Sequence, residues 1–75
     1  MQIELNFAEA LWTALKAWAK EQAADGKTPT ADDCARQVKK ISHELIGPVH
    51  SVRPEVVEFY ASETRDMVER YRVGR

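Results

Sequence analysis

The sequence has 75 residues, of which 44% are hydrophobic and 31% are charged, and its formal net charge is −1. A chain this short has room for one domain, here residues 1–75, and buries too little surface to hold a deep substrate cleft beside a full core. The composition is that of a folded protein, and positive and negative residues are interspersed. The chain therefore lacks the overall field that attracts nucleic acid or anionic lipid.

The cysteine content and the hydropathy pattern indicate in which cellular compartment the protein is expected. Cys34 is the single cysteine, which excludes an internal disulfide and a CxxC-type metal site. No apolar run approaches the roughly 18 residues that cross a bilayer, and the N-terminus lacks the pattern of a signal peptide. We expect a cytoplasmic protein that does not act at a membrane.

The N-terminal residues 1–7 alternate apolar and polar side chains. A period of two is typical of a β-strand, and it places Ile3, Leu5 and Phe7 on one face. We expect a short strand or extended segment here, ahead of the first helix.

A first helix is predicted at about residues 7–24. Asn6 and Glu9 have the spacing of a capping box at its start, and the loop containing Gly26 follows its end. One face carries an apolar stripe with alanines beside it, formed by Phe7, Leu11, Leu15, Trp18, Ala8, Ala14 and Ala19. Trp12 lies about 100° to one side of this stripe and widens the apolar arc.

A second helix is predicted at about residues 31–46. Thr30 and Asp33 repeat the capping-box spacing at its start. Gly47 and Pro48 end it, because glycine suits the left-handed position after a helix and proline cannot continue the hydrogen-bond ladder. Its core face is formed by Cys34, Val38, Ile41 and Leu45.

A third helix is predicted at about residues 55–72. Pro54 suits the start of a helix, and Glu55 complements the helix dipole in the first turn. Its apolar face is formed by Val56, Tyr60, Thr64, Met67 and Tyr71, flanked by Val57 and Val68. The expected fold is therefore mainly α, with a short strand or extended segment followed by three helices. This fold is compatible with a homodimer.

The residues that could carry chemistry have simpler structural interpretations. Cys34 falls in a core stripe without a histidine on the same face, where a free cysteine behaves as a small hydrophobe. Asp32 and Asp33 point about 100° apart in a first helical turn, where acids are favoured as caps. His43 and His50 do not complete a metal-ligand spacing with the cysteine. We therefore predict no catalytic, metal or cofactor site, and a protein that is not an enzyme.

Trp12 and Phe59 are the candidate residues for interaction with another protein. Trp12 lies at the edge of its apolar arc, and Phe59 lies opposite most apolar neighbours on its helix. Aromatic side chains that a small core leaves partly uncovered anchor interfaces, although the same residues can also close the core. A small basic patch on the second helix, which is either functional or a solvated face, consists of Arg36, Lys39, Lys40 and His43.

A short strand followed by an amphipathic helix, a glycine-containing turn and a second capped helix resembles the ribbon-helix-helix repressors. The resemblance covers residues 1–45. In that family, strands from two chains pair and enter the major groove of DNA. The resemblance implies base contacts for Gln2, Glu4 and Asn6, a dimer core of Ile3, Leu5 and Phe7, and a phosphate near the backbone amide of Thr30.

These patterns leave two hypotheses of function. The first is a non-catalytic module that binds, and so regulates or inhibits, another protein through Trp12 and Phe59, as a phage- or mobile-element-type inhibitor of a host protein complex would. The alternative is a dimeric ribbon-helix-helix transcriptional repressor. We favour the first, because no Lys or Arg accompanies Glu4 in the expected strand and attraction to phosphate supplies much of the affinity for DNA.

Overall fold

A computed structural model of the chain describes residues 3–47 and 53–73, with residues 3–6 described by their backbone alone. These residues form three α-helices, and no strand occurs among them. The helices are α1 (Ile3–Ala24), α2 (Ala31–Ile46) and α3 (Pro54–Val73). The prediction of a mainly α fold with three helices is confirmed.

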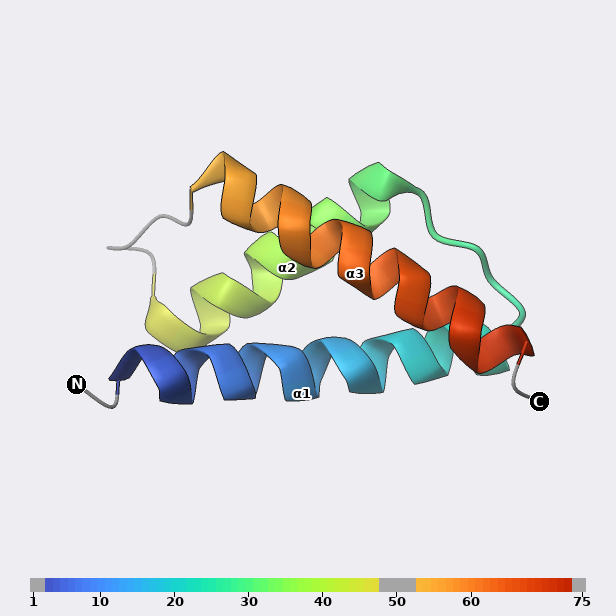
Figure 1. The fold of residues 1–75 in the computed structure, drawn as a ribbon, viewed down its shortest axis with the longest axis horizontal. Helices are drawn as coiled ribbons and strands as arrows, with labels where there is room; N and C mark the ends of the chain where they lie inside the picture. The colour runs from blue at the N-terminus through green and yellow to red at the C-terminus, as the bar shows by residue number, and fades with distance from the viewer. Residues whose placement is uncertain (1–2, 48–52, 74–75) are drawn as a thin grey trace.

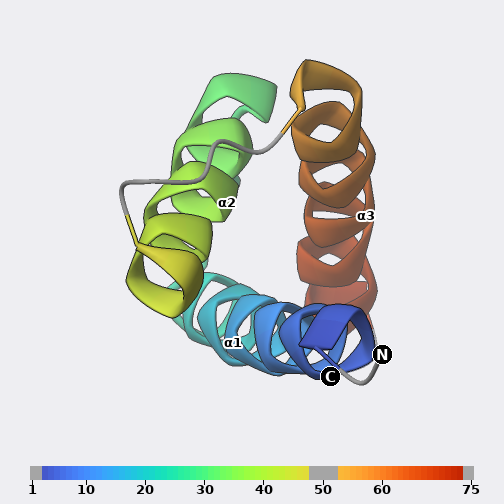
Figure 2. The ribbon, with the colours of Figure 1, turned by 90° about the vertical axis from the view of Figure 1, so that its left-hand side faces the viewer.

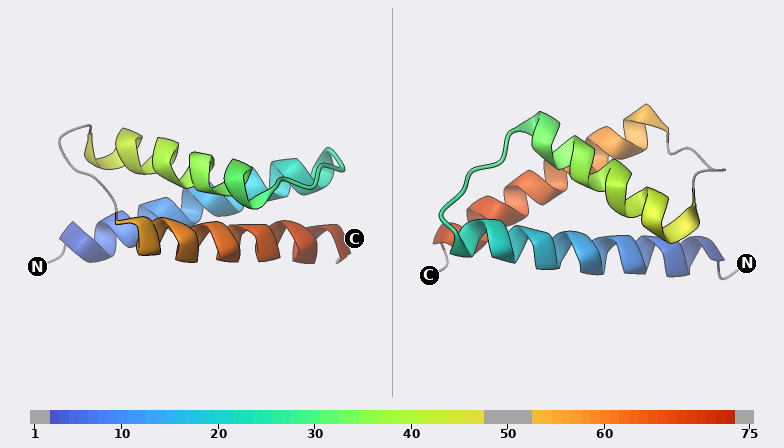
Figure 3. Two further views of the ribbon diagram at one scale, coloured as in Figure 1. Left: turned by 90° about the horizontal axis from the view of Figure 1, so that it is seen from above. Right: turned by 180° about the vertical axis from the view of Figure 1, so that it is seen from behind.

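The helices are arranged so that each one contacts the other two. α1 runs along the long axis of the molecule, and α2 and α3 lie over the same side of it, sloping in opposite directions (Figure 1). Seen from one end, α2 and α3 stand side by side above α1 (Figure 2). The chain runs out along α1, back along α2 and out again along α3, as the views from above and behind show (Figure 3). The whole measures 38 × 23 × 17 Å.

The core is built from one face of each helix. Its buried apolar residues are Leu11, Leu15, Ala19 and Ala23 of α1, Cys34, Val38 and Ile41 of α2, and Val57, Ala61, Met67 and Val68 of α3. Those of α1 recur at every fourth position, which keeps them on one side of the helix. Burial of a large aliphatic side chain contributes about 1.5–3 kcal/mol before the entropy of ordering is subtracted. Because each face needs the other helices to cover it, the three helices are stable as a unit.

The predicted strand is wrong over the part of it that the structure describes. From Ile3 onward the chain is helical, and residues 1–2 lie outside the described residues. Ile3, Phe7 and Leu11 are four residues apart, so two of the three apolar positions of the expected strand, Ile3 and Phe7, also satisfy a helical period. A helix satisfies its own backbone hydrogen bonds, whereas a strand needs a partner strand. Residues 3–6 therefore add a further turn to the predicted start of α1.

The early start of α1 overturns two further predictions. Asn6 lies inside α1, so Asn6 and Glu9 do not form the cap of this helix. The resemblance to ribbon-helix-helix repressors is also wrong, because that fold needs a strand from each chain and the described residues from Ile3 onward are helical. Phe7, instead of joining a ribbon, packs against the core of its own chain.

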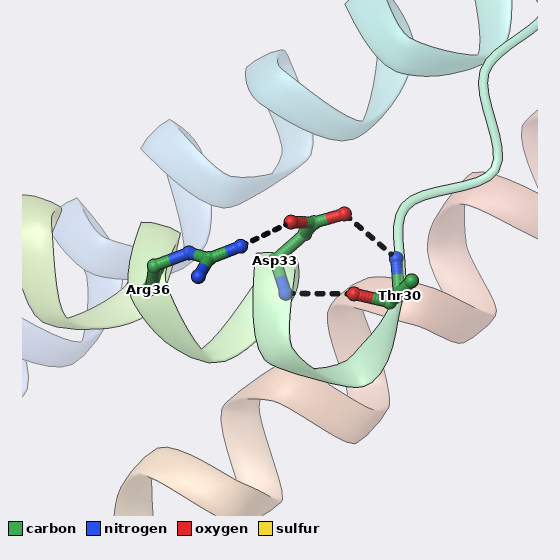
Figure 4. Close-up of polar contacts among 3 residues, drawn as sticks. All are labelled: Thr30, Asp33 and Arg36. Carbon is green, nitrogen blue, oxygen red and sulfur yellow. Dashed lines mark hydrogen bonds and ion pairs between the residues drawn. The ribbon is translucent and has the colours of Figure 1, made fainter.

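α2 has the predicted bounds and begins at the predicted capping box (Figure 4). The backbone N–H of Asp33 donates to Thr30 Oγ1 at 3.1 Å, and the backbone N–H of Thr30 donates to the Asp33 carboxylate at 3.1 Å. Arg36 donates to the second carboxylate oxygen at 2.6 Å. The hydrogen bond from the Thr30 backbone, followed by that from Arg36, lowers the pKa of Asp33. The helix ends at Gly47, whose φ of 82° is left-handed and whose N–H donates to the carbonyl of His43.

The buried face of α3 is rotated relative to the predicted one. Its buried residues are Val57, Ala61, Thr64, Met67 and Val68. Tyr60 and Tyr71, predicted in the centre of the face, are half-buried and pack at its edge. The reason is that α3 contacts both α1 and α2, so its buried face points between them. The small side chain of Ala61 suits this position because it allows a neighbouring helix to approach closely.

The C-terminal part of α2 differs from its predicted pattern at two residues. Leu45, which continues the predicted stripe into the last turn, is 43% exposed. Ser42 is 1% exposed, and its Oγ has no hydrogen-bond partner among the described residues. A buried polar group without a partner costs about 1–3 kcal/mol. The Ser42 hydroxyl is therefore a local source of instability.

We expect the D33N variant to be less stable than the wild type at neutral pH, because it loses the charge attraction to Arg36 and the stronger acceptance of hydrogen bonds by a carboxylate. The native pKa of Asp33 is lowered, so its charge stabilises the fold above the ordinary pKa of 3.8, and this contribution is lost as the pH falls through the native value. Urea unfolding from neutral to strongly acidic pH measures the effect. The difference should shrink below pH 3.8, whereas a constant difference would contradict the prediction. D32N is the control, with the same charge change outside the capping box.

We expect the S42A variant to be more stable than the wild type by about 1 kcal/mol or more, because it removes the unpaired buried hydroxyl. Alanine also has a higher helix propensity than serine. The S62A variant in α3 carries the same propensity change at an exposed position and serves as the matched control. Thermal unfolding of the two variants should show the larger gain for S42A. Equal gains would mean that the Ser42 hydroxyl is satisfied in solution.

Candidate protein-interaction surface

Trp12 of α1 and Phe59 of α3, the two aromatic residues singled out from the sequence, lie together in the structure. Their ring centroids are 6.4 Å apart, and their planes are inclined by 82°. Tyr60 completes the group, with its ring 4.7 Å from that of Trp12 and 5.5 Å from that of Phe59. Edge-to-face and tilted contacts of this kind are favourable for aromatic rings. We call Trp12, Phe59 and Tyr60 the aromatic cluster.

The aromatic cluster has a covered side and an open side. Trp12 and Tyr60 are half-buried and pack against the core, whereas Phe59 is 56% exposed. The helical geometry of α3 explains this difference, because Phe59 lies about 200° from the buried Val57, two residues earlier. The alternative that Trp12 closes the core therefore holds in part, because this residue covers the edge of the core. Phe59 presents more than half of its surface to solvent.

The helix surface around Phe59 is acidic. Glu58 precedes Phe59 directly, and Glu55 and Glu63 lie one turn before and one turn after it. Asp66 lies two turns after it, and the N-terminal half of α3 contains no Lys or Arg. A favourable interaction with the helix dipole accounts for Glu55 in the first turn but not for the other three. We call Glu55, Glu58, Glu63 and Asp66 the acidic face.

A shallow hollow adjoins the aromatic cluster on the side of α1. It is lined by Ala8, Glu9, Trp12, Thr13 and Lys16. One acidic and one basic side chain are present here, so this side of the cluster carries no net charge. The negative charge of the surface therefore comes from α3.

A groove, separate from this hollow, lies between α2 and α3. Its apolar lining consists of the small residues Ala31, Ala35 and Ala61. Its charged lining consists of Asp32, Glu58, Asp66 and Arg65. Glu58 and Asp66 also belong to the acidic face, so the groove adjoins the surface around Phe59. Neither helix alone contains this groove.

The other residues considered from the sequence have structural roles or stand apart from this surface. Cys34 is fully buried, as predicted, and burial raises the pKa of its thiol. Asp33 is engaged in the capping box of α2. His43 is exposed on α2, and His50 lies outside the described residues. Within residues 3–47 and 53–73, no group of three His, Cys, Asp or Glu side chains could hold a metal ion.

The residues with implied DNA contacts do not form a reading strand. Glu4 and Asn6 lie in α1, and Gln2 lies outside the described residues. The backbone amide of Thr30 donates to the Asp33 carboxylate and is not free for a phosphate. In the basic patch of α2, Arg36 pairs with the same carboxylate, and the other three residues are exposed.

Two parts of this surface were missed in the sequence. The apolar pattern of the sequence predicts Tyr60 in the core face of α3, and only the rotation of that face reveals its contact with Trp12. The acidic face is also absent from the predicted site, although its signal is readable in the sequence. Glu55 and Glu63 are spaced by four residues on either side of Phe59, which places all three on one side of a helix.

No protein-family model matches the chain, and no match is found among the curated proteins or the solved structures. Among the described residues, no helix has both the length and the apolar character needed to cross a membrane.

We expect F59A to destabilise the fold by about 1 kcal/mol or less, because most of the deleted ring is already in contact with water. W12A should cost about 2–3 kcal/mol, because it removes a half-buried ring from the edge of the core. Urea unfolding of both variants measures these values. A loss for F59A as large as that for W12A would show that Phe59 acts as a core residue and would contradict its assignment to an open surface.

Proposed function

We propose that the protein is a non-catalytic module that binds another protein through the aromatic cluster. The observation that supports this most directly is that Phe59 is 56% exposed while its ring contacts Trp12 and Tyr60. Exposed aromatic side chains are frequent anchors of protein interfaces because they bury a large apolar area. The contacts with Trp12 and Tyr60 restrict the ring before binding, so little conformational entropy remains to be lost.

A regulatory or inhibitory role is the form of this function that we propose. A single small domain with an exposed aromatic anchor can alter a larger protein by occupying part of its surface. An inhibitor of a host protein complex, of the phage or mobile-element type, fits a chain of 75 residues. The proposed site of action is the cytoplasm, where a free, buried cysteine such as Cys34 remains reduced.

Affinity capture from a host-cell lysate tests this function. Wild-type protein, F59S and K39S are immobilised separately, and the captured proteins are quantified by mass spectrometry. Lys39 is exposed on α2 and lies outside the aromatic cluster, so K39S is a matched surface control. We expect a partner that the wild type and K39S retain and that F59S loses by about tenfold or more, as for an interface anchor.

Circular dichroism and urea unfolding of each variant establish that a loss of capture does not come from a loss of folding. The partner identified in this way is then purified and titrated against the same three proteins. Equal binding by the wild type and F59S would show that the aromatic cluster is not the binding surface.

A further inference from the structure

We infer that the partner presents a basic amphipathic segment, with an apolar side chain that contacts Phe59 and with Lys or Arg side chains that meet the acidic face. This inference rests on the proposed protein-binding function and specifies the chemistry of the partner. Two observations support this inference together, which are the exposure of Phe59 and the negative charge of the residues around Phe59.

The first argument for this partner is charge complementarity between its basic residues and the carboxylates beside Phe59. On a helix, residues four positions apart have Cβ atoms about 5–6 Å from each other. A partner side chain seated on Phe59 therefore has the carboxylates of Glu55 and Glu63 on either side of it. Positive residues that flank the apolar contact would pair with both carboxylates. Such exposed pairs add modest affinity but speed association and select against partners of the wrong charge.

The groove between α2 and α3 supplies a place for a long basic side chain. The methyl groups of Ala31, Ala35 and Ala61 form an apolar lining on which the aliphatic part of Lys or Arg can lie. Asp32, Glu58 and Asp66 also line the groove, and their carboxylates would pair with the cationic end of this side chain. Arg65 is the opposing charge, and three carboxylates against one guanidinium leave the groove negative.

The same charges argue against the other occupants of an exposed aromatic surface. A second copy related by a two-fold axis would place the acidic face of one chain against that of the other, which is repulsive. Nucleic acid and anionic lipid carry negative charge and are repelled for the same reason. An apolar segment with basic residues is the occupant that both the ring and the carboxylates favour.

Selection from a displayed library of random peptides tests the inference even while the natural partner is unidentified. Peptides are selected on folded wild-type protein and depleted on F59S. We expect the enriched peptides to combine apolar residues with Lys or Arg and to carry net positive charge. Their affinity should fall as salt is added, because exposed charge pairs are screened.

Variants that lack the carboxylates then show whether the acidic face binds the basic residues of the selected peptides. The triple variant E55Q/E58Q/E63Q should bind the selected peptides about tenfold more weakly, from modest losses at each exposed pair. K39Q/K40Q, which removes charges from the outer face of α2, should bind them no more weakly than the wild type. Unfolding curves for all variants confirm that the fold is retained.

The outcomes separate this inference from the proposed function. Enrichment of neutral or acidic peptides that still require Phe59, or full binding by the triple glutamine variant, would overturn the charge assignment and leave the protein-binding function standing. Absence of any peptide that depends on Phe59 would overturn both. A dimer in light scattering that dissociates on F59S would show a second copy as the occupant and would also overturn the inference.

Discussion

The structure depends on three amphipathic helix faces that can be covered only by one another. Leu11, Leu15 and Val38 are completely buried where these faces meet. This constraint fixes the rotation of each helix about its own axis. On α3 it places Val57 inside, and because a helix turns about 100° per residue, Phe59 is carried to the outside. The open aromatic surface is therefore a consequence of how the core is packed.

The elements that the sequence predicts correctly are those with local signals. α2 is bounded by a capping box at Thr30 and Asp33 and by a left-handed glycine at Gly47, and these groups satisfy hydrogen bonds within a few residues. The start of α1 was not predictable in this way. Ile3 and Phe7 satisfy a strand period and a helical period equally, and the difference lies in whether a partner strand exists, which a single sequence does not reveal.

Trp12 and Phe59 of the candidate surface were predictable as single residues, but their assembly with Tyr60 was not. Helical periodicity alone marked Trp12 and Phe59 as aromatics at or beyond the edge of an apolar face. Their contact joins α1 and α3, which are far apart in the sequence, so it depends on tertiary packing. Tyr60 was assigned to the core for the same reason, because periodicity locates an apolar arc but not which part of it faces which neighbour. The groove at Ala35 and Ala61 likewise exists only after α2 and α3 have packed.

The two tryptophans of α1 lie on different flanks of its buried stripe, about 120° apart around the helix. Trp12 belongs to the aromatic cluster, in contact with Tyr60, whereas Trp18 is half-buried against the core outside it. The chain thus contains two tryptophan fluorophores in different surroundings, one at the candidate surface and one away from it. Emission from Trp12 can therefore report occupation of the surface, over a background from Trp18, so binding can be followed optically without attaching a dye.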